Sequence, residues 1–348
     1  MKYKNISKLL PLCLLFSITA CNGLTAIEAS FLNEKVEIVI SHDKAGLAKT
    51  VKRVLKELEP YADPRKVGEI LNKYRNCFDD ATRNEFCFTG DLDLYRMLDI
   101  LLEDENDFDY SPHDNGLTSL WREAIFQNTL LDYDVHYQKS EELLPSSANF
   151  VFGGSQKEPR LFYTGDFTFD LRPVIESYAL QKIRDYLGTD LWNGRANNYI
   201  VKTSPNNMYV CSENEPRSVS LNGPYGKRVI INGLRDAYVT MVSSMDSQVT
   251  IGDTTVSTKY IDYTGPYVEN DCVIYVTSKT YHYSMHDAVK SAAKAISVLK
   301  HGCYSFDYEE SQYGMYAIIF KDGVISHCSS YLDVQYDGVS FGSGKMNW

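Results

Sequence analysis

The chain has 348 residues, of which 44% are hydrophobic and 23% are charged, and its formal net charge is −11 at pH 7. This composition is globular rather than disordered, and the length is enough for one large domain or two ordinary ones. The acidic charge argues against nucleic acid or an anionic lipid surface as a direct partner of the folded part.

The first twenty residues have the pattern of an export signal. Three lysines among the first eight residues form a positive segment, and residues 9–18 are apolar but too few to span a bilayer. The segment ends in Ile-Thr-Ala-Cys at residues 18–21, the pattern at which a bacterial signal peptidase cuts before a cysteine that then receives lipid. We therefore expect residues 1–20 to be removed and Cys21 to anchor the protein in a lipid bilayer, facing the periplasm.

The residues after the cut fix several further expectations. Asn22 follows Cys21, where an aspartate would favour the inner membrane, so the outer membrane is favoured. Loss of the three lysines lowers the formal charge from −11 to −14. Residues 21–34 are expected to be a lipidated tether, and residues 35–348 one compact domain.

Six more cysteines follow, and an oxidising periplasm permits disulfides between them, although their pairing stays open. They are Cys77, Cys87, Cys211, Cys272, Cys303 and Cys328. No C-x-x-C pair occurs among them, which argues against a zinc or iron–sulfur site.

Hydrophobic spacing predicts alternating strands and helices in chain order. A strand is expected at residues 35–40, a helix over 47–58 that ends before Pro60, and a second helix around 91–105. Residues 167–170 predict a strand that leads into a helix ended by Gly188. Short β-branched segments predict strands at 199–202, 209–211, 229–232, 249–251, 254–258 and 272–277. A helix over 284–300 and a hairpin of 315–320 with 323–327 complete the chain. No repeat or long linker is visible, so the fold class is α+β, with mixed or antiparallel sheets and packed helices in one unit.

The last predicted helix carries the candidate chemistry. Asp287 and Ser291 stand four residues apart, which places a carboxylate and a hydroxyl on one helix face near the N-terminal end. Hard oxygen ligands suit magnesium, although helix capping alone produces the same pattern. His282 and His286 have no third nitrogen or sulfur ligand nearby, which disfavours a transition-metal site. The absence of G-x-S-x-G disfavours a serine hydrolase.

The order of these segments resembles the ApbE family of FAD:protein FMN transferases. Residues 287–292 are similar to the family motif D-A-L-A-T-A, and residues 259–265 are similar to H-H-I-x-D-P-x-T-G with both histidines replaced. Phe108-Asp109 and residues 117–121 resemble F-D-x-T-x-x-P-L-x-x-L-W, and residues 170–179 resemble D-x-G-G-x-A-K-G-Y-A. The resemblance spans residues 36–324 and implies the T-fold-related architecture of that family.

Departures from the family pattern bear on nucleotide binding. The Gly-Gly pair is Arg172-Pro173 here, which is bulky and lacks one N–H donor. The lysine of the same motif is Glu176, and the glycines of a second motif, N-x-G-G-N, are missing from residues 202–207. We expect dinucleotide affinity to fall unless Arg172 compensates.

The resemblance implies a magnesium-dependent transfer of FMN from FAD to a threonine hydroxyl of an exported or membrane protein. It assigns the metal to Asp287, Ser291 and the Ile175 carbonyl, the flavin nucleotide to Tyr178, Arg172, Thr264 and Asn206, and catalytic orientation to Asp262 and Asp170. The alternative is a degenerate lipoprotein of this fold that binds flavin or acts as a scaffold without turnover. A third possibility is an unrelated solute-binding or assembly lipoprotein.

Overall fold

The computed structural model describes most of the chain after the predicted export signal. The described residues are 25–41, 46–73, 86–88, 91–103, 112–114, 116–130, 133–143, 151–155, 158–163, 168–188, 198–212, 215–251, 254–262, 264–278, 288–302 and 314–342. The export signal, Cys21 and Asp287 lie outside them. No helix within these ranges is long and apolar enough to cross a membrane.

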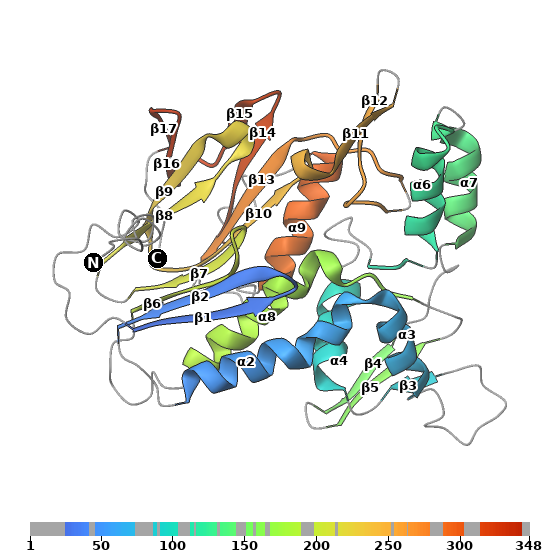
Figure 1. The fold of residues 1–348 in the computed structure, drawn as a ribbon, viewed down its shortest axis with the longest axis horizontal. Helices are drawn as coiled ribbons and strands as arrows, with labels where there is room; N and C mark the ends of the chain where they lie inside the picture. The colour runs from blue at the N-terminus through green and yellow to red at the C-terminus, as the bar shows by residue number, and fades with distance from the viewer. Residues whose placement is uncertain are drawn as a thin grey trace, which may run out of the picture.

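An eight-stranded sheet forms the centre of the molecule (Figure 1). Its order is β1-β2-β6-β7-β10-β13-β14-β15, and every neighbouring pair is antiparallel. The strands are β1 Thr25–Phe31, β2 Glu34–Ile40, β6 Tyr199–Ser204, β7 Asn207–Cys211, β10 Asp236–Ser243, β13 Cys272–Ser278, β14 Met315–Lys321 and β15 Val324–Cys328. β13 is buried along its whole length, because the sheet is covered on both faces.

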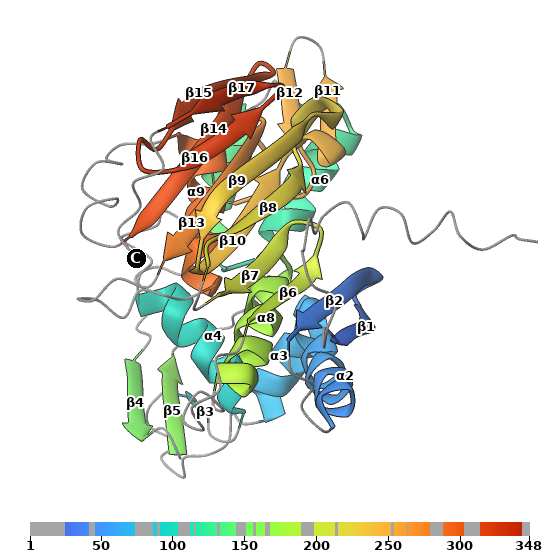
Figure 2. The ribbon, with the colours of Figure 1, turned by 90° about the vertical axis from the view of Figure 1, so that its left-hand side faces the viewer.

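A four-stranded sheet covers one face of the central sheet (Figure 2). Its order is β17-β16-β9-β8, from β8 Arg217–Asn222, β9 Arg228–Leu234, β16 Asp333–Tyr336 and β17 Val339–Phe341. Val229 and Ile231 of β9 pack in one apolar cluster with Val239 of β10 and Ile274 of β13. These residues recur every second position, so one face of each strand fills the space between the sheets.

Helices cover the opposite face. The apolar cluster on this side joins Val201 and Val273 of the sheet to α2 Leu47–Leu58, α4 Leu92–Glu103, α8 Arg172–Gly188 and α9 Ala288–His301. In α2, Leu47, Val51, Val54, Leu55 and Leu58 are buried, so a helical stripe turns inward. α3 Pro64–Lys73 follows α2 through the short 3₁₀ turn η1 Glu59–Ala62.

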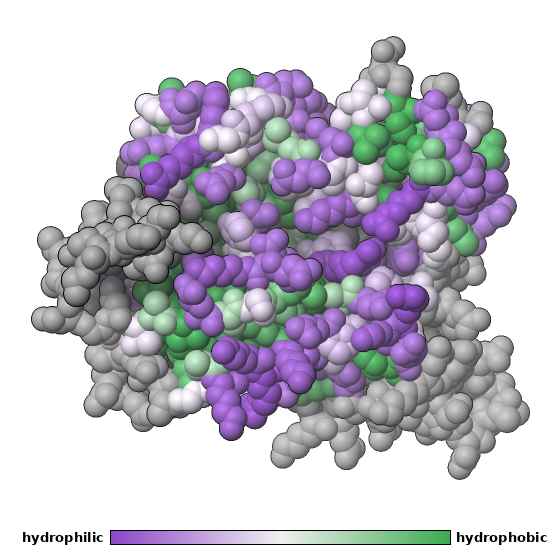
Figure 3. All heavy atoms as spheres, in the orientation of Figure 1, coloured by the Kyte–Doolittle hydropathy of each residue, from purple (hydrophilic) through white to green (hydrophobic). Residues whose placement is uncertain are grey.

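Two smaller units complete the fold. α6 Leu117–Phe126 and α7 Tyr133–Leu143 pack with the hairpin of β11 Gln248–Ile251 and β12 Thr254–Ser257 around the buried Trp121. Figure 3 shows that apolar surface gathers near this unit, while much of the same face is hydrophilic. A three-stranded sheet, β3-β5-β4, is formed by β3 Phe86–Phe88, β4 Val151–Ser155 and β5 Glu158–Tyr163. Two 3₁₀ turns, η4 Pro224–Gly226 and η5 Met245–Ser247, lie in connections.

The predicted fold class is confirmed, and most predicted elements are present. Two expectations differ from the structure. The tether predicted over residues 21–34 is too long, because Thr25–Phe31 form β1 and pair with β2 along their whole length. The strand predicted at 167–170 is reduced to a single bridge between Phe169 and His113.

Candidate functional site

A hollow lies where the start of α8, the second half of α9 and the turn at residues 259–262 meet. It contains about 380 Å³ of space, including its open mouth. It is lined by Pro112, His113, Thr118, Asp170, Pro173, Lys259, Tyr260, Ile261, Asp262, Ile296 and Lys300. The hollow brings together Asp170 and Asp262, the two carboxylates predicted to orient a reaction.

Asp170 is held at the entrance to α8. Its backbone N–H donates to the Pro112 carbonyl over 2.8 Å, and its Oδ1 accepts the backbone N–H of Arg172 over 3.0 Å. The Arg172 guanidinium donates to both carboxylate oxygens, with Nε 2.7 Å from Oδ1. This hydrogen bonding raises the Arg172 pKa. Arg172 therefore remains charged, and the Nε and Nη2 donors that bind Asp170 are not available to an incoming ligand.

Asp262 lies in a tight turn and accepts hydrogen bonds from several directions. Its Oδ1 accepts the backbone N–H of Thr264 over 2.8 Å and the Thr264 hydroxyl over 2.6 Å. Lys300 Nζ lies 2.6 Å from the same oxygen, and His301 Nε2 lies 3.4 Å from Oδ2. Burial alone would raise the Asp262 pKa, but the Lys300 charge and these hydrogen bonds outweigh it and hold the pKa at about 2. Asp262 is thus a fixed anion and a poor proton acceptor at neutral pH.

Lys300 was not identified from the sequence, although it is the cation that neutralises Asp262. Its ammonium also donates to the Gly265 carbonyl over 2.7 Å, so one side chain joins both ends of the turn. The signal that could have revealed it is its place four residues after Ile296, on the buried face of α9. A lysine on an apolar helical stripe requires a partner charge, and the sequence does not say which carboxylate supplies it.

The turn is fixed from the other side by α6 and α7. Gly265 has φ +101°, and a Cβ there would lie 3.2 Å from the Trp121 ring. Tyr133 donates its hydroxyl to the Thr264 carbonyl over 3.3 Å. Thr264, one of the predicted nucleotide-binding residues, therefore lies beside the hollow, but its hydroxyl is already used by Asp262.

His113 is a second lining residue that sequence reasoning missed. It is 7% exposed, and its ring packs 5.0 Å from that of Phe169. Burial lowers its pKa to about 4, so the imidazole is neutral at physiological pH. Sequence spacing gives no signal for this residue, because it reaches the hollow only through the bridge with Phe169.

Two of the three predicted metal ligands, Ser291 and Ile175, do not line the hollow. Ser291 and Lys300 are nine residues apart on α9, about 13 Å along the helix axis. Ser291 is fully buried, and its Oγ hydrogen-bonds Thr277 Oγ1 of β13. Ile175 is fully buried in α8. Asp287, the only charged ligand proposed, lies outside the described residues, and within those residues no three His, Cys, Asp or Glu side chains are grouped to hold a metal ion.

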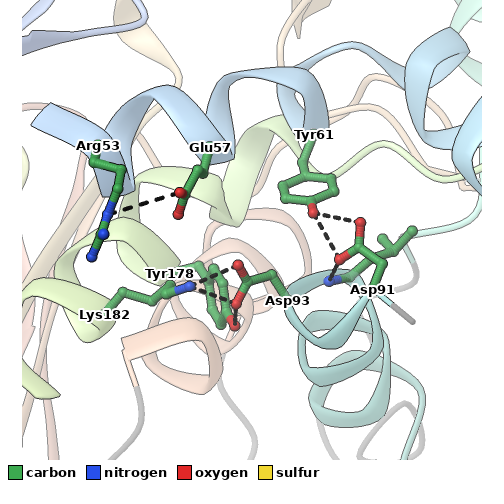
Figure 4. A network of polar contacts seen from close by, with 8 residues as sticks. Arg53, Glu57, Tyr61, Asp91, Asp93, Tyr178 and Lys182 are labelled. Atoms are coloured by element: carbon green, nitrogen blue, oxygen red, sulfur yellow. Dashed lines mark hydrogen bonds and ion pairs between the residues drawn. The ribbon is translucent and has the colours of Figure 1, made fainter. Parts of the chain in front are cut away.

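The Tyr178 hydroxyl points to Asp93 of α4 (Figure 4), and Tyr178 does not line the hollow. Its hydroxyl donates to Asp93 Oδ1 over 2.9 Å, and Lys182 Nζ lies 2.7 Å from both Asp93 oxygens. In the same region, Tyr61 of η1 donates to Asp91 at the start of α4. Tyr178 is only 2% exposed. Its hydrogen bond to Asp93 therefore joins α8 to α4 in the interior of the protein.

Asn206 lies in the turn between β6 and β7, where the predicted nucleotide motif lacks its glycines. Its carbonyl accepts the backbone N–H of Met241 over 2.7 Å. The next residue, Asn207, donates to Glu176 Oε2 over 3.1 Å and accepts from the Ser177 hydroxyl over 2.9 Å. The hairpin is therefore bonded to α8 through Glu176, which stands where the resemblance would place a lysine.

Comparison with known proteins identifies the fold. The sequence matches no protein-family profile and no curated protein sequence. The structure is similar to the ApbE protein of Thermotoga maritima, with a TM-score of 0.58 and 14% identity, covering 88% of this chain and 98% of that one. It is similar to the flavin transferase ApbE of Vibrio cholerae, with a TM-score of 0.59 and 10% identity, covering 91% and 97%. It is also similar to the flavinyl transferase ApbE of Pseudomonas stutzeri, with a TM-score of 0.58 and 11% identity, covering 92% and 97%. The chain thus has the ApbE fold, as the motif order predicted.

Proposed function

We propose that this chain is a flavin-nucleotide transferase that moves FMN from FAD to a threonine hydroxyl of an exported protein. The observation that carries the proposal is the hollow at the start of α8, which gathers Asp170 and Asp262 within a fold shared with flavin transferases. Both carboxylates lie on segments whose sequences resemble transferase motifs, and both are held rigidly by several hydrogen bonds. Rigid placement of the reacting groups is the main requirement of phosphoryl transfer.

The proposed reaction is a phosphoryl transfer and needs no oxidant or reductant. The threonine Oγ forms a bond to the FMN phosphorus of FAD, and the bond from that phosphorus to the bridging oxygen breaks. AMP leaves with the electron pair of the broken bond, and the hydroxyl proton passes to the AMP phosphate or to water. Since the Asp262 pKa is about 2, this residue orients Thr264 and Lys300 rather than accepting the proton. Water in place of threonine would give hydrolysis of FAD.

Magnesium is part of this proposal through Asp287, Ser291 and the Ile175 carbonyl. The ion would neutralise charge on the diphosphate when bound. A hydroxyl and a main-chain carbonyl are neutral and do not make a magnesium site by themselves, so the fit depends on Asp287.

The alternative, a flavin-binding or scaffold lipoprotein without turnover, is favoured by one observation. At the start of α8, the lysine that the resemblance would place there to attract a diphosphate is absent, and the Arg172 guanidinium is already bound. Arg172 is bound to both oxygens of Asp170, and Glu176 brings a negative charge that Asn207 holds in place. An anion approaching this turn meets fewer free donors than in a glycine-rich loop.

We also propose that lipid on Cys21 tethers the protein to a bacterial membrane on its periplasmic side, with the outer membrane favoured by Asn22. Because β1 begins at Thr25, only three residues separate the lipidated cysteine from the sheet. Three extended residues reach about 10 Å, so the folded body would lie against the bilayer. Replacement of Cys21 by Ser should release the protein from the membrane fraction, whereas unchanged fractionation would overturn the anchor.

One experiment separates the first two functions. Purified protein is mixed with FAD and magnesium, and AMP release is followed by chromatography, with a threonine-bearing exported protein as the acceptor. AMP release with flavin covalently bound to the acceptor supports the transferase. FAD retained without AMP release identifies a flavin carrier, and no FAD binding at all leaves the scaffold role.

A further inference from the structure

The charged side chains that line the hollow differ in how fully they are paired. Asp170 is bound by Arg172, and Asp262 is bound by Lys300. Lys259 has no carboxylate within 4.0 Å among the residues that the structure describes, and it is exposed at the mouth of the hollow. Its ammonium lies 5.2 Å from the centre of the Tyr260 ring. Among the described residues that line it, the hollow therefore contains two neutralised pairs and one positive charge that has no carboxylate partner.

Lys259 stays charged at neutral pH. Partial desolvation of the ammonium lowers its pKa, but the Tyr260 phenol and the carboxylates of Glu176 and Asp246 outweigh this and raise the pKa above its ordinary value. Glu176 approaches from α8, and Asp246 approaches from η5. Neither forms an ion pair with Lys259, and Glu176 Oε2 already accepts a hydrogen bond from Asn207.

The other two cations that the structure describes near the hollow already bind a carboxylate. Lys300 donates to Asp262 and Gly265, and its side chain is 2% exposed. Arg172 donates to both oxygens of Asp170. An anion that enters the hollow can gain a strong charge-assisted hydrogen bond from Lys259 without breaking an ion pair.

We propose that Lys259 binds a phosphate oxyanion of the ligand that enters this hollow, and so determines its specificity for phosphorylated nucleotides. The proposal rests on the proposed function in taking a flavin dinucleotide as the natural ligand. It places the phosphate-binding cation on the turn that precedes Asp262, whereas the sequence resemblance pointed to Arg172 at the start of α8. Glu176 would then oppose phosphate binding, because its charge acts on the same ammonium.

The test measures binding of inorganic pyrophosphate and of AMP to the full chain by calorimetry, at low and high salt. Lys259→Met should weaken both by about tenfold or more and reduce the salt dependence, since one charge-assisted hydrogen bond is lost. Lys259→Arg should retain most of the affinity, and Glu176→Gln should increase it. Arg122→Met is the matched control, because Arg122 is an exposed cation that contacts the Thr258 carbonyl but does not line the hollow.

Several results would overturn the phosphate site or separate it from the transferase activity. Equal binding of pyrophosphate by the wild-type protein and Lys259→Met, or no binding by either, overturns it. An equal loss with Arg122→Met overturns it as well, because the effect would then reflect general surface charge. Lys259-dependent binding of pyrophosphate without AMP release from FAD would keep the phosphate site and reject the transferase. AMP release that is indifferent to Lys259 would reject the phosphate site and keep the transferase.

Discussion

Lys300 Nζ lies 2.6 Å from Asp262 Oδ1, and the two side chains are only 2% and 6% exposed. A buried ion pair is costly to desolvate, but removal of one partner is costlier, because the remaining charge is left unpaired. We expect Lys300→Met to lower the free energy of unfolding by about 3–5 kcal/mol. Denaturant unfolding followed by circular dichroism measures this change. Lys52→Met on the exposed face of α2 is the control and should change stability by less than about 0.5 kcal/mol.

The double variant Lys300→Met with Asp262→Asn tests the cause. If the unpaired carboxylate is responsible, the double variant should be more stable than Lys300→Met alone. If the double variant loses as much free energy of unfolding as the two single variants together, that result would contradict the pairing.

His113 should make stability depend on pH in a defined window. Its pKa is about 4 in the folded protein and 6.5 when unperturbed, because burial favours the neutral imidazole. Between these values the unfolded chain binds the proton more readily than the folded protein. The contribution of neutral His113 to the free energy of unfolding is therefore fully present above pH 6.5 and is lost as the pH falls towards 4. The loss should be at most about 3 kcal/mol, and His113→Leu should remove it. Unfolding curves between pH 7 and pH 4 check this. The Asp262 contribution falls at lower pH, from about 4 towards 2, and is therefore separable.

The variant Tyr178→Phe tests whether the Tyr178 hydroxyl has a structural role or binds the nucleotide. Its hydroxyl donates to Asp93, which also binds Lys182, and this contact joins α8 to α4. We expect Tyr178→Phe to cost about 1.5–3 kcal/mol of stability, since a hydrogen bond to a charged group is lost. FAD affinity, measured by fluorescence titration, should change little because the hydroxyl is bound to Asp93 and Tyr178 does not line the hollow. A large loss of FAD affinity with unchanged stability would return Tyr178 to the nucleotide site.

The sequence predicted the sheet and the main helices because their apolar spacing is regular, as in Val36, Ile38 and Ile40 of β2. It missed β1, because that strand follows the proposed lipidation site, Cys21, too closely to be separated from a tether. It placed Asp170 and Asp262 at one site through motif order. It could not identify Lys300 or His113 as lining residues, because these reach the hollow only through α9 packing and a single bridge. Long-range pairings of this kind leave no local pattern.

Ser291 and Asp287 allow the magnesium proposal to be tested against a purely structural role. Ser291 Oγ is buried against Thr277 Oγ1, so Ser291→Ala leaves the Thr277 hydroxyl without its partner and should cost about 1–3 kcal/mol of stability. If Ser291 also binds the metal, Ser291→Ala and Asp287→Ala should both raise the magnesium concentration needed for half-maximal AMP release. Chelation should abolish release by the wild-type protein. If Ser291→Ala loses stability but needs the same magnesium concentration, the Ser291 hydroxyl has a structural role and does not bind the metal. An unchanged requirement in Asp287→Ala as well would remove magnesium from the proposed mechanism, because no charged ligand from this chain would remain in the proposed set.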